Sequence, residues 1–135
     1  MSTPQTFMAD VSAWAAQFPT KMDALARQVS QEMSERVIVA TPVDTGFLRS
    51  SWQPSIGQPK AADGSAGGQG KAIAEVSLVA PQMKAGDVYY MTNNAKYAQH
   101  VEYGTSKMAG RFMVTDNAKR WPVVVNKVAK DLGLI

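Results

Sequence analysis

The sequence predicts an α+β fold in a single domain over residues 1–135, with a long N-terminal helical element, an antiparallel β-meander of about three to four strands, a short helix and a C-terminal helix. Two observations support this prediction. Apolar residues recur at three- and four-residue steps near both ends of the chain, and they alternate with their neighbours in part of its middle. The length of 135 residues is that of one domain, and 45% hydrophobic residues are enough for one core.

The N-terminal helical element consists of two apolar stripes separated by a proline. Pro19 lies between the stripes, so the segment forms either one kinked helix or two short ones, and we favour the kinked helix. We expect Thr41-Pro42 to end it, because the residue before a proline is pushed out of the α conformation. The stripes consist of Phe7, Val11, Trp14, Ala15 and Phe18, and of Met22, Leu25, Ala26, Val29, Met33 and Val37.

Three strands are expected in the middle of the chain, over residues 48–56, 71–80 and 87–92. In residues 71–80 the positions Ile73, Glu75, Ser77 and Val79 alternate with apolar neighbours, which is typical of a strand. Residues 57–70 hold five glycines and little that is apolar, so they predict a flexible loop. The functional alternative is a segment that orders only when a neighbouring subunit covers it.

Two further helices are expected after the strands. Residues 95–103 predict a short helix that Gly104 stops. An apolar stripe then predicts the C-terminal helix, in which Pro122 is tolerated if it lies in the first turn. The stripe consists of Phe112, Ala118, Trp121, Val124, Val125, Val128 and Leu132.

Composition excludes several classes of protein. The chain has no cysteine, which rules out disulfides and thiolate metal sites. We see neither a secretory signal nor an apolar segment of the roughly 20 residues that a membrane helix needs, so we expect folding in a cytoplasm. The formal charge is +3 and the pI is about 9.3, but the basic residues are scattered, which argues against a dedicated nucleic-acid binder.

Catalytic and metal sites are not expected, and neither is a cofactor. His100 is the only histidine, and its neighbour Glu102 is two residues away, a spacing that turns side chains apart on a helix. The carboxylates Asp44, Asp63, Asp87, Asp116 and Glu102 follow no metal-ligand spacing. We expect Asp44 to form a turn with Gly46 at positive φ, and the glycine-rich loop matches no phosphate-binding fingerprint.

Three motifs carry a family likeness. They are residues 40–52 (ATPVDTGFLRSSW), residues 94–105 (NAKYAQHVEYGT) and residues 107–112 (KMAGRF). In this order, between two helices, they resemble the tail-component family of long-tailed bacteriophages, whose members are called neck, tail-completion or minor tail proteins. Two departures are visible: Gly110-Arg111-Phe112 stands where such proteins often have Arg-Pro-Phe, and the loop at 57–70 is longer.

The resemblance implies a non-enzymatic structural protein of the virion neck or tail top, present in the host cytoplasm during assembly. It implies a ring of copies, with a hexamer as the first guess, around the channel through which DNA passes. The implied partners are the head-side connector and the tail terminator or tail tube proteins, with no membrane involved. The alternatives are a small basic nucleic-acid-binding protein and, less favoured, a nuclease or hydrolase that uses His100 and Glu102.

Residue types enriched in protein interfaces, together with cations that would face DNA, suggest where the ring contacts lie. The chain has eight methionines and three tryptophans, which favours an extensive contact surface. The residues expected at a subunit interface or along the channel are Arg49, Trp52, Lys60, Lys71, Lys96, Tyr97, Tyr103, Lys107 and Arg111.

Overall fold

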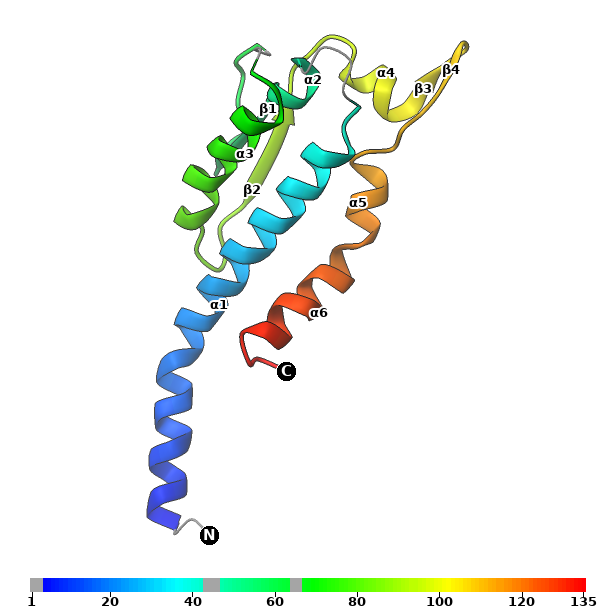
Figure 1. Ribbon diagram of the computed structural model, residues 1–135. Helices are drawn as coiled ribbons and strands as arrows, with labels where there is room; N and C mark the ends of the chain where they lie inside the picture. The colour runs from blue at the N-terminus through cyan, green and yellow to red at the C-terminus, as the bar shows by residue number, and fades with distance from the viewer. Residues whose placement is uncertain (1–3, 43–46, 64–66) are drawn as a thin grey trace.

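A computed structural model describes residues 4–42, 47–63 and 67–135 of the chain. It confirms the α+β class, because a long N-terminal helix and the C-terminal helices are combined with antiparallel strands (Figure 1). The elements are α1 (Pro4–Ala40), α2 (Phe47–Ser50), β1 (Trp52–Ile56), α3 (Gly68–Val79), the 3-10 turn η1 (Ala80–Gln82), β2 (Tyr89–Asn93), α4 (Ala98–Tyr103), β3 (Gly104–Thr105), β4 (Met108–Ala109), α5 (Thr115–Lys119) and α6 (Trp121–Asp131).

Helix α1 is one continuous helix that contains Pro19, as predicted. Its axis bends between an N-terminal part that projects from the molecule and the part that packs on the other elements (Figure 1), which is the effect of a proline inside a helix. The helix ends at Ala40, where the backbone N–H of Thr41 still donates to the carbonyl of Val37 at 3.1 Å. The predicted end at Thr41-Pro42 is therefore confirmed.

The described part of the chain has four antiparallel strands, within the predicted three to four, but they form two separate pairs instead of one meander. β1 pairs with β2 in antiparallel register, from Trp52 opposite Asn93 to Ile56 opposite Tyr89. β3 and β4 form a short hairpin elsewhere. The predicted strands at 48–56 and 87–92 are thus found in part, because residues 47–50 are helical and the second strand begins at Tyr89.

Residues 71–80 lie mostly in helix α3, which corrects the predicted strand. Ala72, Val76 and Ala80 recur every four residues and are fully buried. Alanine and valine occur at so many positions here that a period of two and a period of 3.6 fit the same residues. The helix also includes Gly68 and Gly70 of the predicted loop. Residues 57–63 and 67 are described loop, and 64–66 lie outside the described residues.

The larger core cluster lies where α1, α2, α3 and β1 meet. Trp52 is 4% exposed, and its indole N–H donates to the Thr41 hydroxyl at 2.8 Å, which ties β1 to the end of α1. Contacts within this cluster hold α1, α2, α3 and β1 together. The cluster consists of Val37, Ile38, Leu48, Trp52, Ala72, Val76, Ala80, Ala95, Val101 and Met113.

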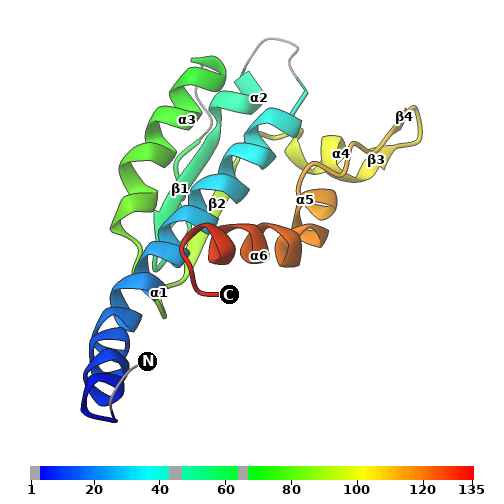
Figure 2. The same cartoon turned by 60° about the horizontal axis from the view of Figure 1, so that its bottom comes forward.

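A smaller cluster attaches α6 to the side of α1 (Figure 2). Val124 and Val128 pack on Val29, and Lys127 donates to the Glu32 carboxylate at 2.9 Å. The hydrogen bond from Lys127 lowers the pKa of Glu32 against the opposing effect of its burial. Pro122 lies in the first turn of α6, as predicted, while the predicted C-terminal stripe is divided between α5 and α6.

None of the helices in the described part of the chain combines the length and the apolar character needed to cross a bilayer.

Candidate assembly surfaces

Residues 98–112, which lie within or between two of the three motifs described above, form a small projecting unit that we call the hairpin lobe. It consists of α4, the β3–β4 hairpin and the return of the chain to Phe112. In both views the lobe lies at the edge of the molecule, beyond the end of α1 that packs in the body (Figures 1 and 2). Gly104 ends α4 with a φ of +84°, which confirms the predicted glycine stop.

Two glycines allow the chain to turn back closely on itself in the lobe. A Cβ on Gly104 would lie 2.5 Å from the backbone nitrogen of Gly110, and a Cβ on Gly110 would lie 2.7 Å from the carbonyl oxygen of Glu102. The segment after β4 is held by backbone hydrogen bonds, from Arg111 N–H to the Val101 carbonyl at 2.7 Å and from Phe112 N–H to the Glu102 carbonyl at 3.0 Å. The lobe is therefore a closely packed unit in which larger residues cannot replace these glycines.

Glu102 connects the lobe to the C-terminal helices. Its side chain is buried, with 6% exposure, and its carboxylate accepts the backbone N–H groups of Val114 at 2.9 Å and Thr115 at 2.8 Å. The Thr115 hydroxyl donates to the same carboxylate. These donors belong to the first turn of α5, so Glu102 satisfies amides that the helix itself leaves unpaired.

The pKa of Glu102 reflects both its burial and these hydrogen bonds. Burial raises the pKa, but the hydrogen bonds from Thr115, Val114 and Met113 lower it by more, so the net shift is downward from 4.5. The carboxylate is therefore charged at neutral pH and acts as a fixed hydrogen-bond acceptor. Sequence reasoning considered Glu102 only as a catalytic or metal-binding residue and missed this role, because its partners lie 12 and 13 residues further along the chain.

The outer surface of the lobe is apolar and basic. Tyr103 is 66% exposed, Met108 46% and Phe112 41%. Lys107 and Arg111 are exposed too, whereas Glu102, the only carboxylate within residues 98–112, is buried. Exposed aromatic, methionine and arginine side chains on one small unit are the composition of a contact surface.

The structure separates the predicted interface residues into two groups. Lys96, Tyr97, Tyr103, Lys107 and Arg111 are exposed, and they lie on the lobe or on the segment leading into it. The remaining four, Arg49, Trp52, Lys60 and Lys71, lie elsewhere.

Trp52 and Arg49 have structural roles within the chain. Trp52 belongs to the buried core, which corrects its expected place at an interface. Arg49 is half-buried, and its guanidinium donates to the carbonyls of Thr41 and Val39, so it holds α2 against the end of α1. Lys60 is exposed in the loop after β1, and Lys71 pairs with Glu75 on α3.

Within the described residues, the side chains considered for catalysis, His100 and Glu102, do not form a site together. His100 is exposed on α4, while the Glu102 carboxylate faces the α5 backbone. Among the residues that the structure describes, no group of three histidine, aspartate or glutamate side chains is placed to hold a metal ion. The turn predicted around Asp44 and Gly46 lies outside the described residues.

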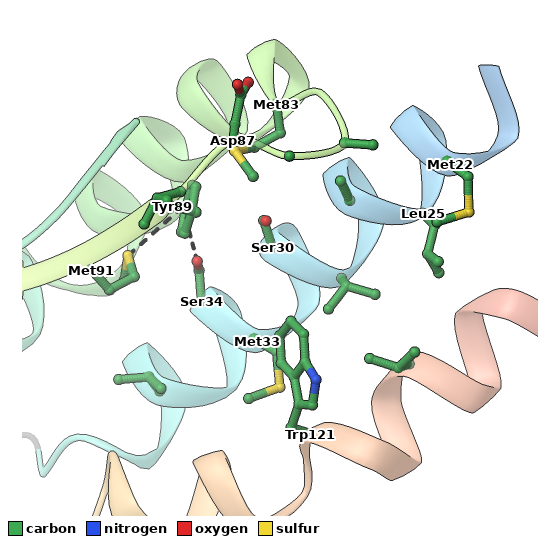
Figure 3. A pocket seen from close by; sticks show the side chains of 17 residues that line it. Met22, Leu25, Ser30, Met33, Ser34, Met83, Asp87, Tyr89, Met91 and Trp121 are labelled. Atoms are coloured by element: carbon green, nitrogen blue, oxygen red, sulfur yellow. Dashed lines mark hydrogen bonds between the residues drawn. The ribbon is translucent and has the colours of Figure 1, made fainter. Parts of the chain in front are cut away.

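A second surface is an apolar groove of about 630 Å³ along α1 (Figure 3). Its floor is the face of α1 between Met22 and Val37, and one wall is the segment 83–91, which includes the start of β2. Trp121 and Val125 of α6 line the other side. Of its 17 lining residues only Asp87 is charged.

The polar groups in the groove are few and partly satisfied. The Ser34 hydroxyl donates to the Tyr89 hydroxyl at 2.9 Å, and the Tyr89 hydroxyl lies 3.8 Å from the sulfur of Met91. Burial raises the pKa of Tyr89 against the opposing effect of the bond from Ser34. The groove is therefore suited to an apolar occupant rather than a charged one.

Compared with known protein families, with curated proteins and with solved structures, the chain shows no match.

Proposed function

We propose that this protein is a structural subunit of the neck or tail top of a long-tailed bacteriophage, where its copies form a ring around the channel that joins head to tail. The observation that carries the proposal is the hairpin lobe. The residues of the family-like motif form this closely packed projection, and its surface is apolar and basic. A projection of this kind is suited to contact a neighbouring subunit.

The positive charge of the hairpin lobe is compatible with a position next to DNA. Lys107 and Arg111 are exposed and no exposed carboxylate lies within residues 98–112. Such a surface attracts the phosphate backbone through its field without forming a dedicated binding site. A channel requires this property, because it must let the DNA slide. We further propose that the role is not enzymatic, since the Glu102 carboxylate serves as a helix cap.

The experiment is a charge reversal on the lobe, made in a phage that carries this gene. Both Lys107→Glu and Arg111→Glu alter exposed side chains, so the fold is retained. We expect the double variant to lose most infectious particles. The matched control is Lys119→Glu with Lys130→Glu, which reverses two exposed cations on α5 and α6. An unchanged titre for the lobe variant would contradict the role of this surface.

Two further measurements separate the proposed class from the alternative. Mass spectrometry of purified virions should detect the protein, and its absence from virions would refute the virion role. Binding of the isolated protein to duplex DNA should be weak. Tight binding with a steep salt dependence would instead favour a small basic nucleic-acid-binding protein.

A further inference from the structure

We propose that the hairpin lobe of one copy docks in the apolar groove of the next copy, with Phe112 as its anchor. The inference rests on the proposed function and deepens it, because it names the contact that would join the copies of a ring. It depends on three observations, which are the backbone conformation of Phe112, the open edge of β2 in the groove wall and the complementary charges of the two surfaces.

Phe112 is held in an unfavourable backbone conformation with its side chain partly exposed. Its φ is +49°, the only positive φ of a residue other than glycine among the described residues, and such a value is an outlier for a bulky side chain. Two backbone hydrogen bonds hold this conformation, from the Phe112 N–H to the Glu102 carbonyl at 3.0 Å and from the Asp116 N–H to the Phe112 carbonyl at 2.9 Å. Strain of this kind is typical of functional sites. Here it accompanies an aromatic ring that is 41% exposed on the lobe.

The lobe exposes two further large apolar side chains. Tyr103 is 66% exposed and Met108 is 46% exposed. None of the residues 98–112 lines the groove of the same copy. In both views the lobe lies beyond the end of α1, whereas the groove runs along this helix (Figures 1 and 2). The two surfaces can therefore meet only between copies.

The wall of the groove that β2 forms is an open strand edge. The Gly57 N–H donates to the Val88 carbonyl at 2.9 Å, so the hydrogen-bonded pairs recur at every second position of the antiparallel register. By this alternation the backbone groups of Tyr89 and Met91 point away from β1. In the described part of the chain, β1 is the only strand that pairs with β2. A strand that enters the groove can therefore pair with these groups.

A projecting hairpin fits this edge better than the β1–β2 sheet of a second copy. The floor of the groove is already formed by α1. A second β1–β2 sheet would bring its own α1 to the same place, because α1 packs on β2 in every copy, where the Ser34 hydroxyl bonds to Tyr89. The β3–β4 hairpin projects from the molecule, away from α1 (Figure 1). We therefore assign the hairpin as the occupant.

The lining of the groove is suited to the apolar side chains of the lobe. Val88 is 56% exposed and Trp121 is 51% exposed, and an occupant would cover both. Methionine side chains are flexible and adapt to an inserted aromatic ring. Four of them line the groove: Met22, Met33, Met83 and Met91.

The charges of the two surfaces are complementary. Lys107 and Arg111 are exposed on the lobe, which has no exposed carboxylate. Asp87 is exposed and is the only charged residue that lines the groove. An exposed ion pair contributes at most about 1 kcal/mol, so the apolar contact supplies most of the affinity. The charges favour one orientation of the lobe and one partner surface.

The contact of one lobe with one groove is small. Tyr103, Phe112 and Trp121 would bury roughly 240–400 Å² together, from their exposed fractions and about 150–250 Å² for each aromatic side chain. A contact built around these rings belongs to the weak interfaces, which bury less than about 1,200 Å². Each copy has one lobe and one groove, so every copy of a closed ring is held twice. The association is therefore expected to depend steeply on concentration.

Sedimentation velocity of the purified full chain over a range of concentrations tests the proposal. We expect the wild type to associate, and Phe112→Asn to raise the dissociation constant at least about ten-fold, because an aromatic anchor is lost. Asparagine adopts a positive φ more readily than phenylalanine, so the variant should keep its fold and a Tm close to that of the wild type. Lost association with a retained Tm is a result that a purely structural role of Phe112 would not give.

Val88→Lys tests the groove independently of the lobe. It places a charge in an apolar contact and beside the cations of the lobe, so it should also raise the dissociation constant at least about ten-fold. Val88 is exposed, so the fold should be retained, which far-UV circular dichroism verifies.

Matched controls make the same changes outside the contact. Val123→Asn alters an exposed apolar residue of α6, and Leu78→Lys alters one of α3; neither residue lines the groove. Both variants should associate as the wild type does. A wild type that stays monomeric at every concentration, or association that is unchanged in both Phe112→Asn and Val88→Lys, would overturn the proposal.

An exchange of charges tests the pairing of the two surfaces. Lys107→Glu with Arg111→Glu should weaken association, and so should Asp87→Lys. All three substitutions in one chain should restore part of the association, because the facing charges are again opposite. The Asp87 carboxylate also accepts the Lys84 N–H at 3.0 Å, so the Tm of Asp87→Lys is measured as a check on that turn. Association that is not restored would contradict the pairing of lobe and groove.

Photocrosslinking identifies the occupant directly. Benzoylphenylalanine in place of Phe112 is irradiated in a mixture with the isotope-labelled chain. It should link to labelled peptides from residues 22–37, 83–91 or 121–125, which line the groove. The same probe in place of Val123 should not link to the residues 83–91. Crosslinks from position 112 to labelled peptides elsewhere would show that the lobe has a different partner surface, and would overturn the proposal.

The outcome is separable from the test of the proposed function. A protein that does not associate through these surfaces but is found in virions refutes the docking alone. A protein that associates through lobe and groove but is absent from virions refutes the virion role alone.

Discussion

Replacement of Glu102 by glutamine tests whether this side chain holds the hairpin lobe on the C-terminal helices. Glutamine has nearly the same size but offers one acceptor oxygen instead of two. One backbone N–H of the α5 turn would keep its partner, while the new amide –NH₂ would face a donor from Val114 or Thr115. The substitution therefore removes an acceptor without creating a cavity.

The expected magnitude follows from the hydrogen bonds that the carboxylate accepts. A hydrogen bond to a charged group contributes about 1.5–3 kcal/mol, and a buried donor without a partner costs about 1–3 kcal/mol. Val114 is exposed and Thr115 is half-buried, so water can replace part of what is lost. We expect Glu102→Gln to lower the free energy of unfolding by about 1.5–3 kcal/mol, and Tm by roughly 5–12 °C for a chain of this size.

The pH dependence provides an independent check. The pKa of Glu102 in the folded protein lies below the usual 4.5, so near that pH the unfolded chain binds more protons than the folded one. The stabilisation is therefore complete above the unfolded pKa and is lost as the pH falls through the folded pKa. Glutamine does not titrate, so the difference between wild type and variant should be largest at neutral pH and shrink on acidification.

The assay is urea unfolding followed by tryptophan fluorescence, with buried Trp52 as a reporter, at about pH 7 and then stepwise to about pH 3. Glu75→Gln is the matched control, because it makes the same chemical change at a side chain that is 38% exposed, and its effect should stay within about 0.5 kcal/mol. Equal stabilities of wild type and Glu102→Gln, or a difference that does not change with pH, would refute the reasoning.

Two further predictions concern the close packing of the lobe and the core. Gly110→Ala should lower Tm, because the new Cβ would meet the Glu102 carbonyl at 2.7 Å, whereas Gly70→Ala in α3 has open space and should stabilise by about 0.5–1 kcal/mol; similar Tm values for the two variants would contradict this. Trp52→Phe should cost about 1–3 kcal/mol, because the indole N–H that donates to Thr41 is lost and a gap is left. A urea midpoint equal to that of the wild type would argue against that bond.

Features with a local cause could be predicted from the sequence. The course of α1 through Pro19, its end before Pro42, the stop of α4 at Gly104 and the place of Pro122 in the first turn of α6 all depend on backbone restrictions of single residues. These restrictions act whatever the rest of the chain does, and the structure confirms each of them.

The segment that became α3 shows where local patterns fail. Its alanines and valines fit an alternating and a helical period equally well, so the sequence alone did not decide between strand and helix. Packing decided it, because Ala72, Val76 and Ala80 form one face that is buried between α1 and the β1–α2 segment. For this reason most of the strand predicted over residues 71–80 is helix in the structure.

The difference between what the sequence predicted and what the structure shows is largest at the candidate assembly surfaces. The motif around residues 94–112 could be picked out from its residues alone, because it is continuous in the chain. The capping role of Glu102 depends on Thr115, and the close turn at Gly104 depends on Gly110. The groove is lined by side chains from Met22 to Val125, which are far apart in the chain. The sequence by itself determined the motifs and the helix ends, which are set by neighbouring residues. Only the tertiary structure decided which polar groups are capped and which apolar faces stay open, since these depend on contacts between distant residues.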